Sequence, residues 1–360
     1  MVVAILICGL FLAYANGAND NFKGVATLYG SGVASYKTSL IYSTMATIAG
    51  SLSSIFVARG LIAIFSGKGL VPDAIVSTPS FALAVALAAA LTVMLATRLG
   101  YPISTTHALT GALAGTGLMA ANGNIAFIKL GSAFFLPLIL SPFVSLILAY
   151  VFYPLVAKLA PADSCLCVTE RPVLVDVNTA TTSSAFVIAD QKSCATEGST
   201  TILNFNSTKI LDALHFLSAG LVCFARGLND TPKLAALLIM VPFLSTETII
   251  IPIAASMAIG GVIHSRRIAE TMSHKVTTMN SKQGFAANFI TAVVVNTGSR
   301  LNLPVSTTHA SCGTLFGIGL QTKSANWTTI KHILTAWVVT LPTAAIFGYF
   351  FYNLILRIVS

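Results

Sequence analysis

The sequence predicts an all-α polytopic membrane protein made of two similar halves. Three observations support this prediction: a high apolar content, apolar runs of membrane-spanning length, and two motifs that each occur twice. The chain of 360 residues is 55% hydrophobic and only 9% charged, whereas a soluble protein carries about 25% charged residues. Because so few charges cannot keep a large surface hydrated, most of the surface is expected to face lipid.

Several apolar runs approach or exceed the length, roughly 18 to 20 residues, that crosses a bilayer as a helix. Examples are Phe81–Ala96, Gly131–Leu159 and Ile249–Ile263. The first apolar run has no basic segment before it and no small-residue cleavage site after it, so we do not expect a removed signal peptide. The expected location is the plasma (inner) membrane, as a multi-pass integral protein.

The formal net charge of +9 is explained by topology rather than by a nucleic-acid partner. Lys and Arg crowd into the loop 264–282 between two apolar runs, and the positive-inside rule places such a loop in the cytoplasm. If successive apolar segments cross the membrane in alternate directions from that loop, the chain makes ten crossings and both termini lie outside. We expect contact with membrane lipid and no nucleic acid.

A polar cluster, Ser-Thr-Thr-His, occurs twice within a longer duplicated segment. RLGYPISTTHALTGALAGTG at 98–117 and RLNLPVSTTHASCGTLFGIG at 300–319 are identical at 12 of 20 positions. A second pair, YANGANDNFKGVATL at 14–28 and FARGLNDTPKLAALL at 224–238, matches at 7 of 15 positions. The pairs are offset by 202 and 210 residues, which indicates that the membrane part is duplicated as a whole.

The duplication divides the chain into two membrane repeats, 1–159 and 209–360, joined by a polar central loop at 160–208 that we place in the cytoplasm. Each repeat contains about five membrane segments. Because five is odd, the second copy should have the inverted topology of the first. Inverted-topology repeats with broken or re-entrant helices near the midplane are typical of transporters, whose binding site lies where the repeats meet.

Two acidic residues, Asp20 and Asp230, fall at membrane depth and are the equivalent residues of the two Gly-x-Asn-Asp motifs. A carboxylate in hydrocarbon costs at least about 2.5 kcal/mol, so an intramembrane Asp is by default a functional-site hypothesis. Gly17, Gly227 and Pro232 flank these motifs. They predict helix breaks that free backbone carbonyls to face a cavity.

The Asn-Asp motifs predict a cation site. Side-chain oxygens of Asn19 and Asn229, the two carboxylates and freed carbonyls are hard ligands that suit a small hard cation such as Na⁺. A proton on Asp is the other way to neutralise the site. The alternative is that these side chains only form hydrogen bonds between helices. No other metal and no cofactor is expected.

The two Ser-Thr-Thr elements predict an anion site. Pro102 and Pro304 precede them by two residues, which favours a helix that begins at the serine. The N-terminus of a helix presents free N–H groups and binds anions, and hydroxyls add donors. The alternative is ordinary N-capping. The candidate anion-binding residues are Ser104, Thr105, Thr106, Ser306, Thr307 and Thr308.

Two further features follow each hydroxyl cluster. His107 and His309 are expected to pack or to cap rather than to relay protons. Glycines at 111, 115 and 117, and again at 313, 317 and 319, form faces that let helices approach closely.

The Gly-Ala-Asn-Asp at 17–20, the Gly-Leu-Asn-Asp at 227–230 and the two Pro-x-Ser-Thr-Thr elements resemble those of the inorganic phosphate transporter (PiT) family. The resemblance covers both halves. It implies an inverted-repeat secondary transporter that takes up inorganic phosphate with Na⁺ or H⁺ and that forms a homodimer. It also implies that the Asn-Asp pairs serve the cation and the Ser-Thr-Thr elements serve phosphate.

One feature departs from the pattern of that family, whose members commonly carry Asn three residues after each Asp. Here these positions hold Lys23 and Lys233. A spacing of three residues puts each Lys on the same helix face as its Asp. The Lys could pair with the Asp and compete with Na⁺, could help to hold the anion, or could snorkel to an interface.

Other classes fit less well. An enzyme is not expected, since neither an H-E-x-x-H nor a G-x-S-x-G motif occurs. An anion channel would need a continuous pore, whereas paired cation and anion elements suit coupled transport. A symporter of sulfate or of another tetrahedral oxyanion is the nearest alternative. Monobasic phosphate, unlike sulfate, can donate a proton to Asp20 or Asp230.

Overall fold

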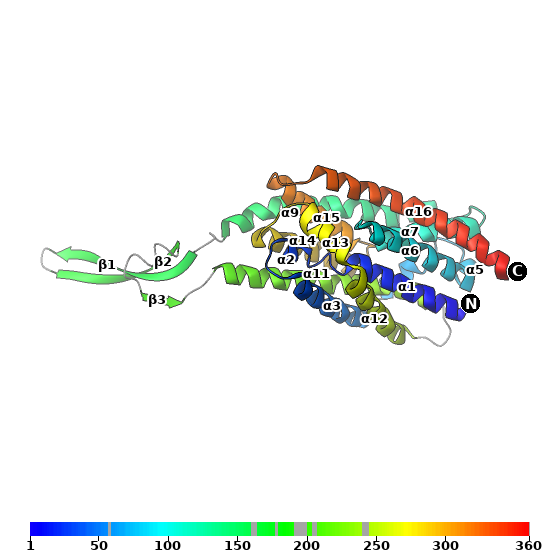
Figure 1. Cartoon of the computed structure of the whole chain (residues 1–360), viewed down its shortest axis with the longest axis horizontal. Coiled ribbons are helices and arrows are strands. Elements are labelled where there is room, and N and C mark those ends of the chain that lie inside the picture. The colour runs from blue at the N-terminus through cyan, green and yellow to red at the C-terminus, as the bar shows by residue number, and fades with distance from the viewer. Residues whose placement is uncertain are drawn as a thin grey trace.

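The computed structural model describes residues 1–56, 59–159, 164–176, 179–190, 200–203, 207–239 and 245–359. The two halves form one elongated bundle of helices, and a small sheet extends from one of its ends (Figure 1). Both termini lie at the opposite end.

The first half consists of long helices joined by short ones. Its elements are α1 (Val2–Asp20), α2 (Ala26–Gly30), α3 (Tyr36–Ser53), the 3₁₀ turn η1 (Ser54–Phe56), α4 (Arg59–Phe65), α5 (Asp73–Val76), α6 (Pro79–Leu99), α7 (Thr105–Ala120), α8 (Phe127–Lys129), the π-helical turn η2 (Leu130–Phe135) and α9 (Leu136–Leu159).

The second half repeats this order with fewer short elements. It contains α11 (Ser207–Leu238), α12 (Thr246–His264), α13 (Arg266–Glu270), the π-helical turn η3 (Thr271–Lys275), α14 (Ser281–Arg300), α15 (Thr307–Gln321) and α16 (Trp327–Val359). By sequence offset, α1 corresponds to α11, α3 to α12, α6 to α14, α7 to α15 and α9 to α16.

The central segment, which we expected to be a polar loop, contains three strands. They are β1 (Ser164–Asp176), β2 (Thr179–Asp190) and β3 (Thr200–Leu203), in an antiparallel sheet of order β2-β1-β3. Runs rich in Val, Thr, Ile and Phe fit a pleated sheet. The segment is therefore polar overall, but it has the residue types of strands. The membrane part of the chain is helical, as predicted.

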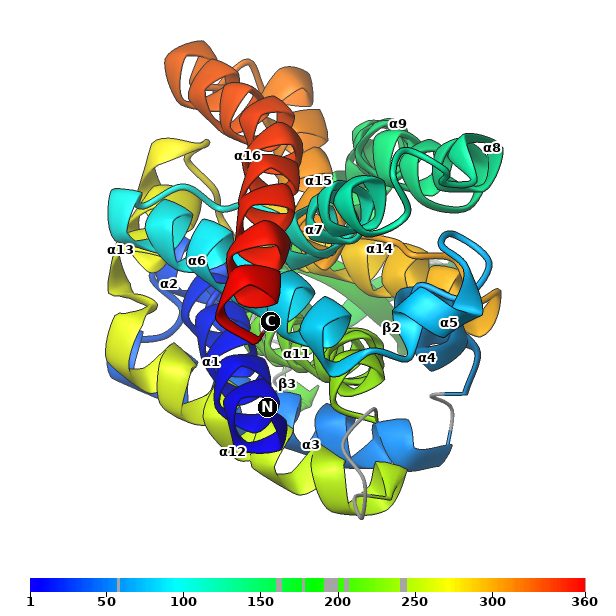
Figure 2. The same cartoon turned by 90° about the vertical axis from the view of Figure 1, so that its right-hand side faces the viewer.

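Seven helices in the described part of the chain are long and apolar enough to cross a membrane. This is fewer than the ten crossings expected. The difference arises because α7 and α15 have only 16 and 15 residues, and because α14, although 20 residues long, carries many polar side chains. Residues 105–117 of α7 and 307–319 of α15 are almost entirely buried. Along the bundle axis, α7 lies near the centre, whereas α9 and α12 lie toward the outside (Figure 2).

The halves pack crosswise through glycines of the Gly-x-Asn-Asp motifs. A Cβ at Gly17 of α1 would lie 1.9 Å from the carbonyl oxygen of Met257 in α12. A Cβ at Gly227 of α11 would lie 2.3 Å from the carbonyl oxygen of Thr47 in α3. Each first helix therefore rests on the second helix of the other half. Only glycine permits such a close approach.

The half-length helices α7 and α15 pack in the same crossed manner. A Cβ at Gly115 of α7 would lie 1.9 Å from the carbonyl oxygen of Ala345 in α16. A Cβ at Gly317 of α15 would lie 2.3 Å from the carbonyl oxygen of Leu146 in α9. The small-residue faces thus serve helix packing, as expected. Exposed side chains such as Phe143, Ile147 and Ile346 cover the outer surface of α9 and α16, as a lipid-facing surface requires.

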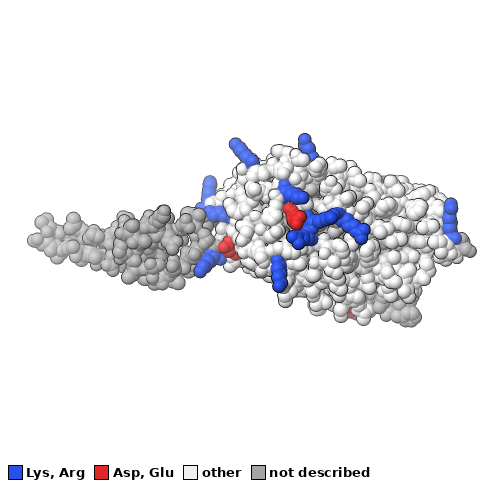
Figure 3. Space-filling model, in the orientation of Figure 1, with Lys and Arg blue, Asp and Glu red and all other residues white. Residues whose placement is uncertain are grey.

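Charge is distributed unevenly on the face shown in Figure 3. Lys and Arg side chains occur from one end of the bundle to a cluster near its middle, and a broad uncharged region covers most of the other half (Figure 3). An uncharged region of this kind suits contact with lipid.

Candidate functional site

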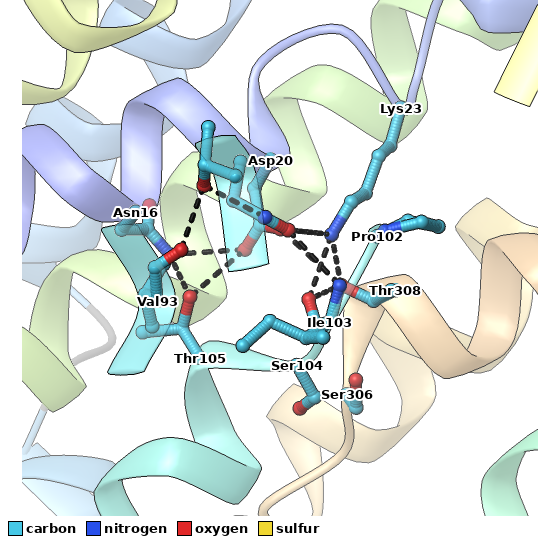
Figure 4. Close-up of polar contacts among 12 residues, drawn as sticks. Asn16, Asp20, Lys23, Val93, Pro102, Ile103, Ser104, Thr105, Ser306 and Thr308 are labelled. Carbon is cyan, nitrogen blue, oxygen red and sulfur yellow. Dashed lines mark hydrogen bonds and ion pairs between the residues drawn. The ribbon is translucent and has the colours of Figure 1, made fainter. Parts of the chain in front are cut away.

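The first candidate cluster lies where α1 ends. Asp20 is its last residue and is 1% exposed. The Asp20 carboxylate accepts hydrogen bonds from Asn16 Nδ2 at 3.0 Å, Thr105 Oγ1 at 3.2 Å and Thr308 Oγ1 at 3.2 Å. It also forms an ion pair with Lys23. Figure 4 shows these side chains converging from α1, α7 and α15. Hydroxyls of both halves therefore meet at one carboxylate.

The Lys23 ammonium is enclosed by oxygen atoms. Besides Asp20, it donates to Asn19 Oδ1 at 2.7 Å, to the Ile103 carbonyl at 2.8 Å and to Thr308 Oγ1 at 2.7 Å. The residue is 4% exposed, so its side chain does not snorkel to an interface. These four oxygen partners are of the kind that a small cation would bind. In this structure the ammonium takes that place.

The second cluster has the same plan with longer contacts. Lys233 Nζ donates to Asp230 Oδ1 at 3.2 Å, to the Val305 carbonyl at 3.1 Å and to Thr106 Oγ1 at 2.9 Å. Val305 is the counterpart of Ile103, and Thr106 is the counterpart of Thr308. Each lysine therefore binds the Asp and the carbonyl of its own half and a threonine of the other half.

The expected break of the second helix is wrong. α11 runs without interruption through Gly227 and Pro232 to Leu238, although Pro232 cannot donate the backbone hydrogen bond of a helix. The first half does break, but after Asp20 rather than at Gly17. The carbonyls that face the site are instead those of Ile103 and Val305, which precede α7 and α15.

The Ser-Thr-Thr elements begin helices as predicted. Ser104 and Ser306 are N-caps, and their hydroxyl oxygens accept from the backbone N–H of His107 and His309, both at 3.1 Å. The threonines that follow point toward the charged clusters, with one exception. In the described part of the chain the Thr307 hydroxyl, which corresponds to Thr105, makes no hydrogen bond to Asp230.

The two motif asparagines connect the Asp-bearing helices to the segments before the half-length helices. Asn19 Nδ2 donates to Thr97 Oγ1 at 2.8 Å, and Asn19 Oδ1 accepts from the Ile103 N–H at 3.1 Å. Asn229 Nδ2 donates to the Val305 carbonyl at 3.2 Å, and Asn229 Oδ1 accepts from Ser299 at 3.1 Å. These contacts fix the carbonyls that hold the lysines.

The sequence reasoning missed two side chains of the site, Asn16 and Arg226. Asn16 Nδ2 donates to Asp20 and, at 3.4 Å, to Asp230, so it connects the two carboxylates. Arg226 Nε lies 3.7 Å from Asp230 Oδ2. The two residues are 210 positions apart, which is the offset of the duplicated motif. Their equivalence by duplication could have identified both as residues of the site.

The two histidines contact each other between the half-length helices. His107 Nδ1 and His309 Nε2 are 3.1 Å apart, and His309 Nδ1 donates to the Leu138 carbonyl at 3.2 Å. The ring of His309 also packs on Trp337, with centroids 3.9 Å apart. These contacts agree with the expected packing role.

A buried charged cluster, shared by two crossed halves of a helical bundle, defines a membrane transporter rather than an enzyme. In agreement with this, the chain matches a model of the phosphate transporter family over residues 16–348. The chain belongs to this family. It is a multi-pass integral membrane protein of the plasma membrane.

Proteins named as inorganic phosphate transporters are similar to this chain over nearly their whole length. A probable low-affinity inorganic phosphate transporter of Bacillus subtilis is 26% identical, covering 99% of this chain and 98% of the relative. One of Rhizobium meliloti is 28% identical, covering 96% and 94%. A solved structure titled as the sodium-dependent phosphate transporter superposes with a TM-score of 0.78 at 20% identity, covering 99% of both chains. That likeness concerns the fold.

Proposed function

We propose that this phosphate transporter is a symporter in which phosphate and a cation bind together at the two Asp–Lys clusters. The observation that carries the proposal is the set of donors on Asp20. Its carboxylate accepts from two threonines of opposite halves, from Asn16 and from Lys23. The carboxylate therefore occupies the kind of environment that an oxyanion needs.

In this proposal the Ser-Thr-Thr elements hold phosphate. The N-termini of α7 and α15 carry unpaired N–H groups and the positive ends of two helix dipoles. Thr105 and Thr308 already donate to a negative group. Ser104 and Ser306 orient both helix ends as caps, and Thr106 and Thr307 lie beside them. Phosphate would compete with Asp20 for the same donors.

This competition gives a reason for coupling. When Asp20 binds a proton, its charge disappears and the carboxyl becomes a donor. The threonines and Lys23 are then available to phosphate, and the protonated Asp20 can donate to it as well. A proton and phosphate therefore favour each other's binding, which is what symport requires.

The coupling cation is proposed to be H⁺ at least as readily as Na⁺. The relevant contacts are those of Lys23 and Lys233, whose ammonium groups take the oxygen ligands that Na⁺ would need. Na⁺ would have to displace a buried lysine from its Asp, and breaking a buried ion pair is costly. The structural neighbour is titled sodium-dependent, but the similarity at 20% identity concerns the fold.

Alternating access would use the two crossed repeats. Equivalent helices such as α1 and α11 run in opposite directions along the bundle (Figure 1), which supports the predicted inversion of topology. Asn19 and Asn229 connect each Asp-bearing helix to the segment directly before the half-length helix of its own half. Movement of one repeat against the other would therefore carry the anion elements with it. The homodimer implied by the family resemblance stays a prediction.

The test is uptake of radiolabelled phosphate into proteoliposomes at fixed pH. One set receives a Na⁺ gradient, and a second, Na⁺-free set receives an imposed proton gradient. We expect concentrative uptake in the second set, and weaker competition by sulfate than by unlabelled phosphate. No response to the proton gradient with strict dependence on Na⁺ would contradict H⁺ coupling. Equal competition by sulfate would contradict selectivity for phosphate.

A further inference from the structure

Arg226 is a buried cation that has no counterpart in the first half. It lies one turn before Asp230 in α11 and is 1% exposed. The equivalent position in α1 is Asn16, which is neutral. A guanidinium stays protonated in proteins, so the charge of Arg226 cannot be removed by titration.

The contacts of Arg226 leave its charge largely uncompensated. Its Nη1 donates to Asn21 Oδ1 and Thr47 Oγ1, both at 3.3 Å, and its Nη2 donates to Asn16 Oδ1 at 3.1 Å. All three acceptors are neutral. Its Nε is buried without a hydrogen-bond partner, 3.7 Å from Asp230 Oδ2. That carboxylate is already paired with Lys233.

The buried charges therefore do not balance. Among residues whose side chains are described, the buried cations are Lys23, Arg226 and Lys233, and the buried carboxylates are Asp20 and Asp230. One positive charge remains in excess. The other titratable side chains near the cluster are the imidazoles and thiols of His107, His309, Cys223 and Cys312, and none of these supplies a carboxylate.

We infer that Arg226 sets the charge with which substrate is bound: the loaded site takes one net negative charge. A monobasic tetrahedral oxyanion satisfies this alone, and a dibasic one satisfies it together with one proton or one monovalent cation. The reason is that an unbalanced charge in a low-dielectric interior is unfavourable. The unpartnered Nε–H is a donor that the anion can use. This inference rests on the proposed phosphate function.

The experiment measures the number of protons taken up when phosphate binds, and it does not depend on transport. Phosphate is titrated calorimetrically into the purified full-length protein in Na⁺-free choline buffers of different ionisation enthalpy, at a pH where free phosphate is mostly dibasic. We expect the wild type to take up one proton for each phosphate bound. Arg226→Lys, which keeps the charge, should take up the same number. A wild-type count of zero or of two protons would overturn the inference.

Arg226→Gln removes the excess charge and should weaken phosphate binding about ten- to a hundredfold, the effect of losing a charged donor. Arg266→Gln is the matched control, because the side chain of Arg266 is 80% exposed, and it should bind like the wild type. Unchanged affinity and proton count in Arg226→Gln would refute the role of Arg226. If Arg226→Gln does not fold, the proton counts of the wild type and Arg226→Lys decide. Absence of phosphate binding to the wild type would instead contradict the proposed function.

Discussion

The Asp20 and Asp230 clusters share a sequence motif but differ in how tightly their carboxylates are held. Asp20 ends a helix, and three neutral donors reach it at 3.0 to 3.2 Å in addition to Lys23. Asp230 lies inside the unbroken α11, and its partners lie at 3.2 to 3.7 Å. The duplication has therefore kept the ion pair while its surroundings changed.

The exchange of one residue accounts for much of this difference. In the first half Asn16 connects Asp20 to Thr105, whereas in the second half Arg226 stands in the equivalent place and Thr307 has no bond to Asp230. Two cations then flank Asp230 and one flanks Asp20. We therefore expect Asp20 to be the carboxylate that exchanges its donors with substrate, and the surroundings of Asp230 to supply positive charge.

The largest expected effect is the loss of coupling when either carboxylate is removed. Asp20→Asn and Asp230→Asn should each reduce concentrative phosphate uptake into proteoliposomes to the level of empty liposomes, because the neutral Asn amide can neither take up a proton nor supply the negative charge that attracts a cation. Asp73→Asn, at an exposed position of α5, is the control and should transport normally. Native uptake by one Asn variant would show that its Asp does not couple.

A smaller effect should distinguish the two threonines that correspond by duplication. Thr105→Val removes a donor that contacts Asp20 at 3.2 Å, and it should raise the apparent KM for phosphate about ten- to a hundredfold, the effect of losing a hydrogen bond to a charged group. Thr307→Val should raise it less, since no bond to Asp230 is lost. Initial rates of uptake over a range of phosphate concentrations measure both values. Equal increases would mean that the two halves contribute alike.

The smallest effect should be the same in both halves. Ser104→Ala and Ser306→Ala each remove an N-cap whose hydrogen bond is 3.1 Å long, which is worth about 1 kcal/mol. Thermal unfolding in detergent, followed by tryptophan fluorescence, should show similar decreases in Tm. Ser104→Thr and Ser306→Thr should recover most of the loss. Clearly different decreases would show that one serine has a further structural role.

Much of the site could be predicted because its parts are local or duplicated. The N-caps follow from Pro-x-Ser-Thr-Thr, and the pairing of Lys23 with Asp20 follows from their spacing of three residues. The oxygen cage around each lysine could not be predicted. It depends on Thr308 and Thr106 reaching across from the other half, and such crossed contacts follow from tertiary packing rather than from any local pattern.

The fold shows the same limit. The apolar runs and the repeats predicted the helical membrane bundle correctly. The helix break predicted at Pro232 was wrong, because the effect of a proline depends on the packing around α11. The strands β1 and β2 lie in a segment whose polar overall composition concealed short runs of strand-forming residues, such as the Val, Leu and Thr residues of β1 and the Thr, Phe, Val and Ile residues of β2. Local propensity is a weak guide where neighbouring elements decide the outcome.

The proposal with the most consequences is that Lys23 and Lys233 occupy cation positions, so that H⁺ drives phosphate uptake at least as well as Na⁺ does. The most direct test is phosphate uptake by Lys23→Asn, Lys233→Asn and the double variant, with Na⁺ and proton gradients applied separately at fixed pH. The exposed Lys331→Asn serves as the control. Removal of the lysines should open the oxygen cages, so we predict increased dependence on Na⁺ and a weaker response to the proton gradient. An unchanged response of the double variant to both gradients would contradict the claim.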